Sequence, residues 1–241
     1  MSSLLLPRRF YSQPQGAVSI DWSNPLANGL INAFNGSSLN DLVDKNKKIV
    51  LAGTGAITAT DKGLALTGTG DAAVGTLDIK LSQYDAVTVS ALVNIQTSGT
   101  AVIFETSTNY NLNTGAFGIF VTSTYFELGF NLGSIMLAPY YARPNNGWHF
   151  ITVVIYKNAA YYGDRITLFI DGVKIVPLGW HNVTNGTYPF YDGLLYVMSR
   201  GNTSIYMKGS IAPFFIHGIA LSDDEAITIS ANPWQIFKVS E

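Results

Sequence analysis

The sequence predicts an all-β fold: an antiparallel β-sandwich with an extended N-terminal arm and one short C-terminal helix. Several segments alternate between apolar and polar side chains, or run apolar on both faces, as strands do. Short turns rich in Gly, Asn and Asp separate these segments. With 241 residues the chain can bury a substantial core in one domain.

The first predicted strands lie in the middle of the chain. Residues 86–95 place branched or small apolar side chains at every second position, which predicts a strand with one firmly buried face. Residues 117–121 and 126–132 repeat this period. The short polar turn around Ser123-Thr124 joins these two segments into a predicted hairpin.

Two further strands are predicted at residues 147–154 and 166–175. The second contains Asp171-Gly172, and glycine supplies the positive φ that a two-residue hairpin turn requires. We expect Trp148 and Phe169 to be substantially buried, because each belongs to a segment that is apolar on both faces.

One helix is predicted near the C-terminus. Ser222-Asp223-Asp224-Glu225 is a capping box, in which the Ser hydroxyl accepts from a backbone N–H and the Glu carboxylate reaches back. Asn232-Pro233 ends the helix after a few turns.

Residues 1–20 differ from the rest of the chain. They hold two prolines, two arginines and two glutamines, without a sustained period. We expect an arm over residues 1–20 that docks on the domain of residues 21–241 or on a neighbouring chain. The residues expected to make the arm contacts are Arg8, Arg9, Phe10 and Tyr11.

The composition indicates that much of the surface contacts a partner protein. Apolar residues make up 47% of the chain and charged residues only 12%, about half the usual share. The net charge of −2 offers no electrostatic reason to bind nucleic acid or an anionic membrane, so we expect neither as a partner. The first ten residues lack the apolar core of a signal peptide, and we expect none.

Four stretches resemble laminin-G-like or concanavalin A-like domains in their order and spacing. They are Gly63-Leu64-Ala65-Leu66, residues 86–93, Gly147-Trp148-His149 with Ile170-Asp171-Gly172, and the segment from Gly209 to the helix at Ser222. The family often has Trp where Leu92 stands. The resemblance covers about residues 60–235 and implies a jelly roll. This fold serves adhesion, sugar binding, catalysis and virion architecture, so it leaves the function open.

A narrower resemblance lies at the two ends of the chain. Residues 21–30 look like the opening of tailed-bacteriophage virion proteins that carry this domain, and residues 221–237 look like their ending. Pro7-Arg8-Arg9-Phe10 fits the same group. The resemblance implies a structural protein located in the virion, on the capsid or the tail. Its partners would be other virion proteins and further copies of itself.

No pattern of catalytic residues is present, so we expect a protein that is not an enzyme. Sandwich-fold glycanases use two carboxylates on one strand face. None of the four glutamates, Glu105, Glu127, Glu225 and Glu241, has a second acid two residues away on a strand. The three histidines, at 149, 181 and 217, lack the spacing of a zinc site. We expect His149 and His217 to be packed or hydrogen bonded.

Calcium is the cofactor that the resemblance would bring, held at the sandwich rim by Asp and carbonyl oxygens. Calcium takes six to eight oxygen ligands, and the sequence has no local cluster of acids, so we expect no bound metal. The alternative role for the loop acids and amides is ordinary turn chemistry. The residues that could serve calcium are Asp71, Asp164, Asp192 and Asn202.

Aromatic and polar side chains gather in two segments that could bind a ligand or a partner. Aromatic rings with amides suit sugar stacking, and they equally suit protein interfaces. The low charge favours the interface, which makes a non-enzymatic virion protein the first expectation. The alternative is a carbohydrate-binding adhesin that recognises a host surface glycan. The candidate residues are Trp180, His181, Tyr188 and Tyr191 in one segment and Tyr140, Tyr141 and Arg143 in the other.

Overall fold

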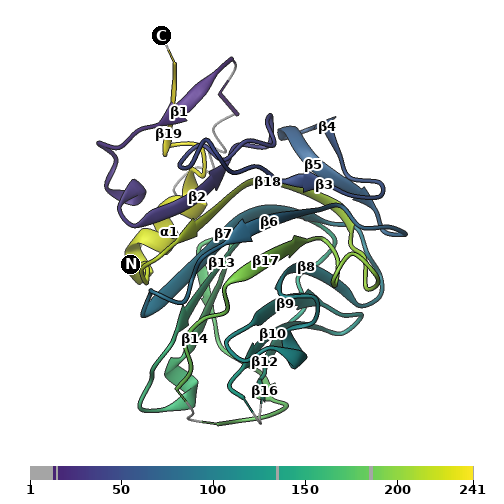
Figure 1. The fold of residues 1–241 in the computed structure, drawn as a ribbon, viewed down its shortest axis with the longest axis vertical. Helices are drawn as coiled ribbons and strands as arrows, with labels where there is room; N and C mark the ends of the chain where they lie inside the picture. The colour runs from purple at the N-terminus through teal and green to yellow at the C-terminus, as the bar shows by residue number, and fades with distance from the viewer. Residues whose placement is uncertain (1–12, 15, 134–135, 185–186, 241) are drawn as a thin grey trace, which may run out of the picture.

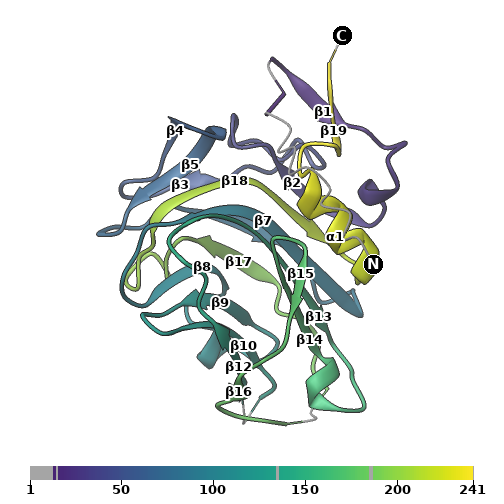
Figure 2. The ribbon, with the colours of Figure 1, turned by 180° about the vertical axis from the view of Figure 1, so that it is seen from behind.

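The computed structural model describes residues 13–14, 16–133, 136–184 and 187–240. Their strands form two large antiparallel sheets stacked face to face, and a separate two-stranded ribbon. Figure 1 and Figure 2 show one sheet curving around the other. The predicted antiparallel β-sandwich is confirmed.

The inner sheet, here the β10 sheet, has strands from both halves of the chain. Its order is β16 (Gly179–Trp180), β12 (Pro139–Ala142), β10 (Tyr125–Asn131), β9 (Phe117–Val121), β8 (Ala101–Thr106), β17 (Gly193–Val197), β6 (Gly75–Ile79) and β3 (Val50–Leu51), with β11 (Met136–Leu137) paired to β10. Single-turn 3₁₀ helices, η1 (Pro25–Ala27), η2 (Tyr110–Leu112) and η3 (Tyr162–Asp164), lie in the connections.

The outer sheet, here the β13 sheet, curves around the inner one. Its order is β15 (Val173–Ile175), β14 (Ile166–Ile170), β13 (Gly147–Tyr156), β7 (Ala86–Ile95), β18 (Lys208–His217), β5 (Gly63–Thr69) and β4 (Ala56–Thr60), with β2 (Leu30–Phe34) paired to β18. The ribbon is β1 (Val18–Ile20) with β19 (Phe237–Val239).

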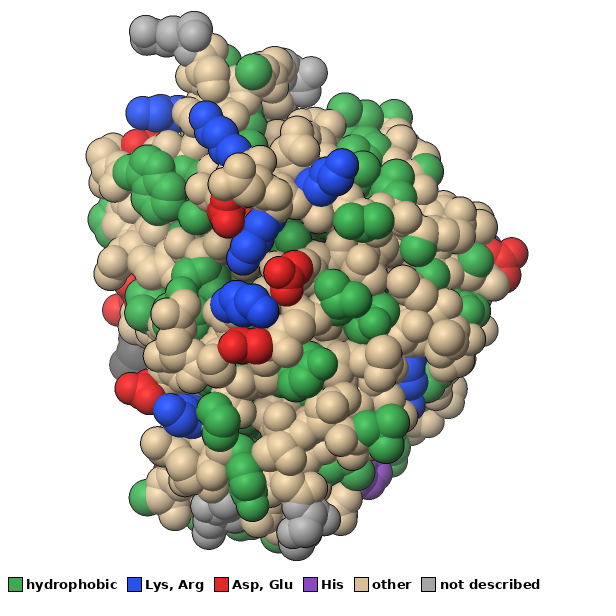
Figure 3. Space-filling view, in the orientation of Figure 1, with side chains coloured by type: hydrophobic (Ala, Val, Ile, Leu, Met, Phe, Trp, Pro, Cys, Tyr) green, Lys and Arg blue, Asp and Glu red, His purple; other side chains and the backbone are tan. Residues whose placement is uncertain are grey.

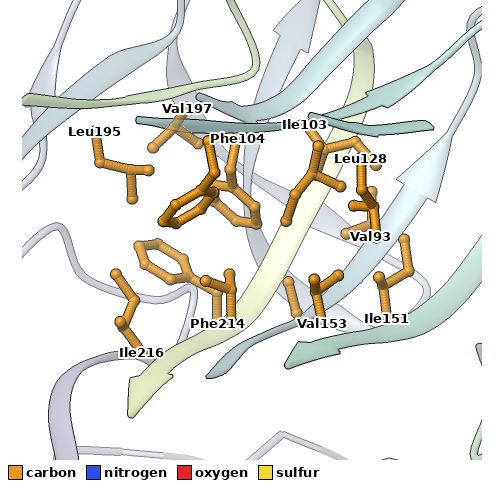
Figure 4. Packing of buried hydrophobic residues seen from close by; sticks show 14 of the residues in the cluster. Val93, Ile103, Phe104, Leu128, Ile151, Val153, Leu195, Val197, Phe214 and Ile216 are labelled. Carbon is orange, nitrogen blue, oxygen red and sulfur yellow. The ribbon is translucent and has the colours of Figure 1, made fainter. Parts of the chain in front are cut away.

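The main core lies between the two sheets. Figure 4 shows Phe104 and Leu195 of the β10 sheet facing Phe214 and Ile216 of the β13 sheet. A second apolar cluster covers the opposite face of the β13 sheet, beneath the helix and the ribbon. The two clusters together bury both faces of β7, where one firmly buried face was predicted.

Both predicted hairpins form. Strands β9 and β10 pair in register across the polar turn at residues 122–124. Strands β14 and β15 pair across Asp171-Gly172, whose φ angles are 52° and 77°. Both turn residues are therefore left-handed, as a type I′ hairpin requires.

The predicted helix is α1 (Asp223–Ala231), with both halves of its capping box in place. The Ser222 hydroxyl accepts from the N–H of Glu225 at 3.3 Å, and the Glu225 carboxylate accepts from the N–H of Ser222 at 2.8 Å. Helix α1 packs on the convex face of the β13 sheet (Figure 2). Among the described residues, no helix is long and apolar enough to span a bilayer.

The burial prediction is confirmed for Phe169, which is 1% exposed, and is too strong for Trp148. Trp148 lies near the start of β13 and is only partly buried against the second cluster. Its indole N–H donates to the Asp61 carboxylate at 2.7 Å. A polar partner at the surface thus keeps one edge of the ring accessible.

The arm residues Arg8, Arg9, Phe10 and Tyr11 lie outside the described part of the structure. The described part of residues 1–20 packs on the chain's own domain. Gln13 is buried, and its side-chain oxygen accepts from the N–H of Leu64 at 2.6 Å. Strand β1 pairs with β19, and Ile20 is buried in the second cluster.

Candidate functional site

The candidate site lies on the outer face of the β10 sheet, the face turned away from the main core. Along β10, Phe126 and Leu128 point into the core, so Glu127 between them points outward. Glu127 stands directly opposite Phe120 of β9 and Tyr140 of β12. Residues opposite one another share a face, so these three side chains form one row across three strands.

At the edge of this sheet, four side chains form a cluster that we call the aromatic strip: Tyr125, Glu127, Tyr140 and His181. The ring of Tyr140 lies 4.8 Å from that of Tyr125 and 4.6 Å from that of His181. His181 Nε2 lies 2.9 Å from the Glu127 carboxylate. A Cβ atom on the facing Gly179 would lie only 2.4 Å from the Tyr140 hydroxyl, so glycine there makes room for the ring.

The strip is accessible to solvent. The His181 side chain is 49% exposed and that of Glu127 is 28% exposed, while Tyr125 and Tyr140 are half-buried. The strip therefore offers ring faces next to a carboxylate and an imidazole. This combination can stack on the apolar face of a sugar and bond its hydroxyls.

An ion pair with a buried carboxylate lies beside this row on the same face. The Glu105 side chain is fully buried on β8, and both of its oxygens lie 3.1 Å from Nε of Arg200. The Arg200 guanidinium lies over the rings of Phe120, at 5.3 Å, and Tyr110, at 5.7 Å. The backbone N–H of Tyr110 also donates to Glu105 at 2.9 Å.

The electrostatics of this pair reflect its burial. Desolvation raises the pKa of Glu105 above its usual range, opposed by the bond from Tyr110 and by Arg200. Burial also raises the pKa of the Tyr110 phenol; Arg200 opposes this shift, whereas the charges of Glu105 and Glu127 add to it. The charges of the Glu105–Arg200 ion pair and of Glu127 in the aromatic strip therefore both act on the Tyr110 phenol.

The structure separates the residues expected to bind a ligand or partner. Tyr140 and His181 come together in the aromatic strip. Trp180 and Tyr188 are partly buried and pack against the main core. Tyr191 is partly buried on the loop before β17.

Two of the expected residues serve the fold. Tyr141 is fully buried, because it alternates with Tyr140 on β12 and points into the core opposite Phe126; its prediction as a ligand or interface residue is wrong. Arg143 is committed to two neighbouring loops. Its Nη2 donates to the Thr97 carbonyl at 2.6 Å and to the Asn146 side chain at 2.7 Å.

The sequence analysis did not single out Tyr125 or Arg200, and it considered Glu105 and Glu127 only as possible catalytic acids. The period of two in residues 126–132 already implied that Tyr125 and Glu127 face away from the core. Glu105 also stands out as an acid that directly follows four apolar residues in its strand. No local pattern marks Arg200, which reaches Glu105 only through the pairing of β8 with β17.

Two of the loop residues that could serve calcium accept hydrogen bonds from protein groups, one from a distant loop and one within its own turn. The Asp192 carboxylate accepts from the N–H groups of Leu81 and Ser82, and the Asn202 side chain accepts from the Ser199 hydroxyl. The described residues contain no group of three or more His, Cys, Asp or Glu side chains suited to a metal. The four candidates lie on separate loops and are Asp71, Asp164, Asp192 and Asn202.

A groove of about 440 Å³ lies between β1 and the loop of residues 35–45. Ser19, Asn35, Asp41, Lys45 and Ser240 are among its lining residues. The lining offers hydroxyls and amides without aromatic faces, so the groove lacks the stacking surface that the aromatic strip provides.

No family model matches the sequence, and no curated protein matches it. Several solved structures do match in fold. The binding domain of botulinum neurotoxin DC in complex with rat synaptotagmin II has a TM-score of 0.62 at 12% identity, and the match covers 85% of this chain and 52% of that one. The same domain in complex with SialylT matches with a TM-score of 0.62 at 14% identity, over 85% and 52% of the two chains.

A further match is a structure of botulinum neurotoxin type C, a toxin whose cell entry is dependent upon interaction with two ganglioside molecules. Its TM-score is 0.62 at 14% identity, over 85% of this chain and 51% of that one. This chain therefore spans about half the length of these neighbours. At such low identity the likeness concerns the fold, and it shows that this chain shares a β-sandwich with toxin binding domains.

Proposed function

We propose that this protein is a non-enzymatic recognition module that binds a glycan on a host surface. The observation that carries the proposal is the aromatic strip, where Tyr125 and Tyr140 present ring faces beside the Glu127 and His181 side chains. Sugar sites combine such stacking surfaces with a few placed polar groups. The solved neighbours bound to SialylT or described as interacting with gangliosides support the same class.

A glycan array followed by calorimetric titration tests the proposal. We expect saturable binding of one glycan class by the full chain, weakened at least about tenfold, or about 1.4 kcal/mol, by Tyr140→Ala. Tyr161→Ala is the matched control, because the Tyr161 ring also packs against a second tyrosine and is not part of the strip. Binding that is lost equally in both variants, or that is unaffected by Tyr140→Ala, contradicts the assignment.

A second candidate function is assembly into a tailed-phage particle. One observation favours it: apolar side chains are exposed on edge strand β15 and just beyond it, with Val173 60%, Val176 79% and Leu178 61% exposed. In Figure 3, hydrophobic side chains are spread over the visible face among uncharged polar ones, while charged side chains gather mainly in one band. Such a surface favours association with other copies or with other virion proteins.

Sedimentation of the purified chain distinguishes the two candidates. Assembly through this segment predicts self-association that Val176→Asp weakens and Tyr140→Ala leaves intact. A chain that stays monomeric at high concentration and binds a glycan supports the recognition module instead.

A further inference from the structure

We propose that Arg200 forms a carboxylate-binding subsite beside the aromatic strip, so that the ligand is an acidic glycan. The inference rests on the proposed function and narrows its ligand from sugars in general to sugars that carry a carboxylate. Three observations support this inference. The Nη edge of the Arg200 guanidinium has no protein partner among the described residues, neighbouring side chains hold the guanidinium in place, and Arg200 lies beside the outward-facing residues of the β10 sheet.

The Nη edge of the guanidinium is partly accessible, since the Arg200 side chain is 19% exposed. Nε of Arg200 lies 3.1 Å from both oxygens of Glu105. Within the described part of the chain, Nη1 and Nη2 donate to no protein acceptor, and neither is a fully buried atom. These nitrogens carry the paired N–H groups that match a carboxylate in a bidentate manner.

The guanidinium is held in place before any ligand arrives. The Glu105 carboxylate accepts from Nε, and it also accepts from the N–H of Tyr110. Cζ of the guanidinium lies over the rings of Phe120, at 5.3 Å, and Tyr110, at 5.7 Å, a cation–π arrangement. An arginine held in this way loses little side-chain entropy on binding.

Glu105 also decides what kind of anion suits the site. The buried carboxylate balances the charge of Arg200, so the pair attracts anions in general only weakly. What remains is a planar set of directed donors. The geometry therefore favours an anion with two oxygens that bond both Nη atoms, as a carboxylate has, over a spherical anion.

The subsite and the strip lie close enough for one ligand to reach both. Phe120, Glu127 and Tyr140 stand side by side on adjacent strands. Adjacent strands are about 4.8 Å apart, which places Phe120 and Tyr140 about 10 Å apart, with Arg200 above Phe120. A short oligosaccharide can stack on Tyr140 and extend its acidic group to Arg200.

Glu127 lies between the two ends, where its charge would oppose an acidic ligand. Its carboxylate is held by His181 at 2.9 Å. The paired carboxylate can accept from sugar hydroxyls along the row. We therefore expect the acidic group of the ligand to lie at Arg200 and the neutral ring to lie over Tyr140.

The test is a titration of the full chain with two oligosaccharides that differ only in a terminal sugar, glucuronic acid in one and glucose in the other. We expect the wild-type chain to bind the acidic ligand at least about tenfold more tightly. Arg200→Lys keeps a cation near Glu105 but removes the pair of Nη donors. This variant should reduce the preference for the acidic ligand to less than about threefold, and its affinity for the neutral ligand should not change.

Two further variants keep the result interpretable. Arg143→Lys is the matched control, because the Nη2 atom of Arg143 is already bonded to protein acceptors. The double variant Glu105→Leu with Arg200→Met removes both charges, so that neither is left without its partner, and it should lose the acidic preference as well.

The outcomes separate the two proposals. If both ligands bind equally well and Tyr140→Ala weakens both, the recognition module stands and the Arg200 subsite is overturned. If the acidic preference persists in Arg200→Lys, the subsite is likewise overturned. If neither ligand nor any glycan on the array binds, both proposals fail.

Discussion

His217 makes the stability of this protein depend on pH in a way that can be measured. Its side chain is fully buried at the end of β18, and Nε2 donates to the Leu26 carbonyl at 2.9 Å. The other ring nitrogen, Nδ1, is buried and has no partner among the described residues. A second proton on Nδ1 would therefore place an unpaired charge in the core.

Burial lowers the pKa of His217 from 6.5 to about 4, opposed by its bond to Leu26 and by the charge of Glu225. The folded state thus prefers the neutral ring, while the unfolded chain takes up a proton near pH 6.5. Stability from this residue is fully present above pH 6.5 and is lost as the pH falls towards 4. At 1.36 kcal/mol per pKa unit, the loss is about 3 kcal/mol.

Urea unfolding at several pH values between 7.5 and 4 measures this loss. His217→Gln keeps an N–H for the Leu26 carbonyl and does not titrate, so its free energy of unfolding should fall by about 3 kcal/mol less than that of the wild-type chain over this range. His181→Gln is the control, because the His181 side chain is 49% exposed. If the free energy of unfolding falls by the same amount in His217→Gln as in the wild-type chain, His217 is not buried as a neutral imidazole.

Two further predictions concern the fold. Phe169→Ala should cost about 3–5 kcal/mol in urea unfolding, because the ring is 1% exposed, whereas Trp148→Ala should cost less, because Trp148 is only partly buried; equal costs would contradict the burial assignment. Gly172→Ala should cost about 1–2 kcal/mol, because φ is 77° in the hairpin turn; a neutral substitution would argue against the left-handed turn.

Much of the fold could be predicted because its signals are local. The period of two in residues 117–121 and 126–132 predicts one hairpin, and Asp171-Gly172 predicts another; both form. The capping box at Ser222 fixed the start of α1. The sequence did not reveal that both faces of β7 would be covered, because the covering elements come from the distant ends of the chain.

The candidate site could be predicted only in part. Tyr140 and His181 were found by composition, but composition cannot tell which of two adjacent tyrosines faces outward, so Tyr141 was included wrongly. The order of strands in a sheet is non-local: β8 pairs with β17, nearly a hundred residues away, and this pairing brings Arg200 to Glu105. No spacing of residues in the sequence predicts such a contact.

The way the sandwich buries its two sheets explains why recognition would use the β10 sheet. Helix α1, the β1–β19 ribbon and the second apolar cluster cover the convex face of the β13 sheet. On the outer face of the β10 sheet, η2 places Tyr110 beside Phe120, with Arg200 over both rings.

This partial cover has a physical consequence. It buries Glu105 deeply enough to require a cationic partner, while it leaves the Nη edge of that partner in contact with solvent. A sheet face built only for solubility needs neither a buried carboxylate nor a row of rings. Their presence together on the face that the helix leaves uncovered is why we propose this face as the binding surface.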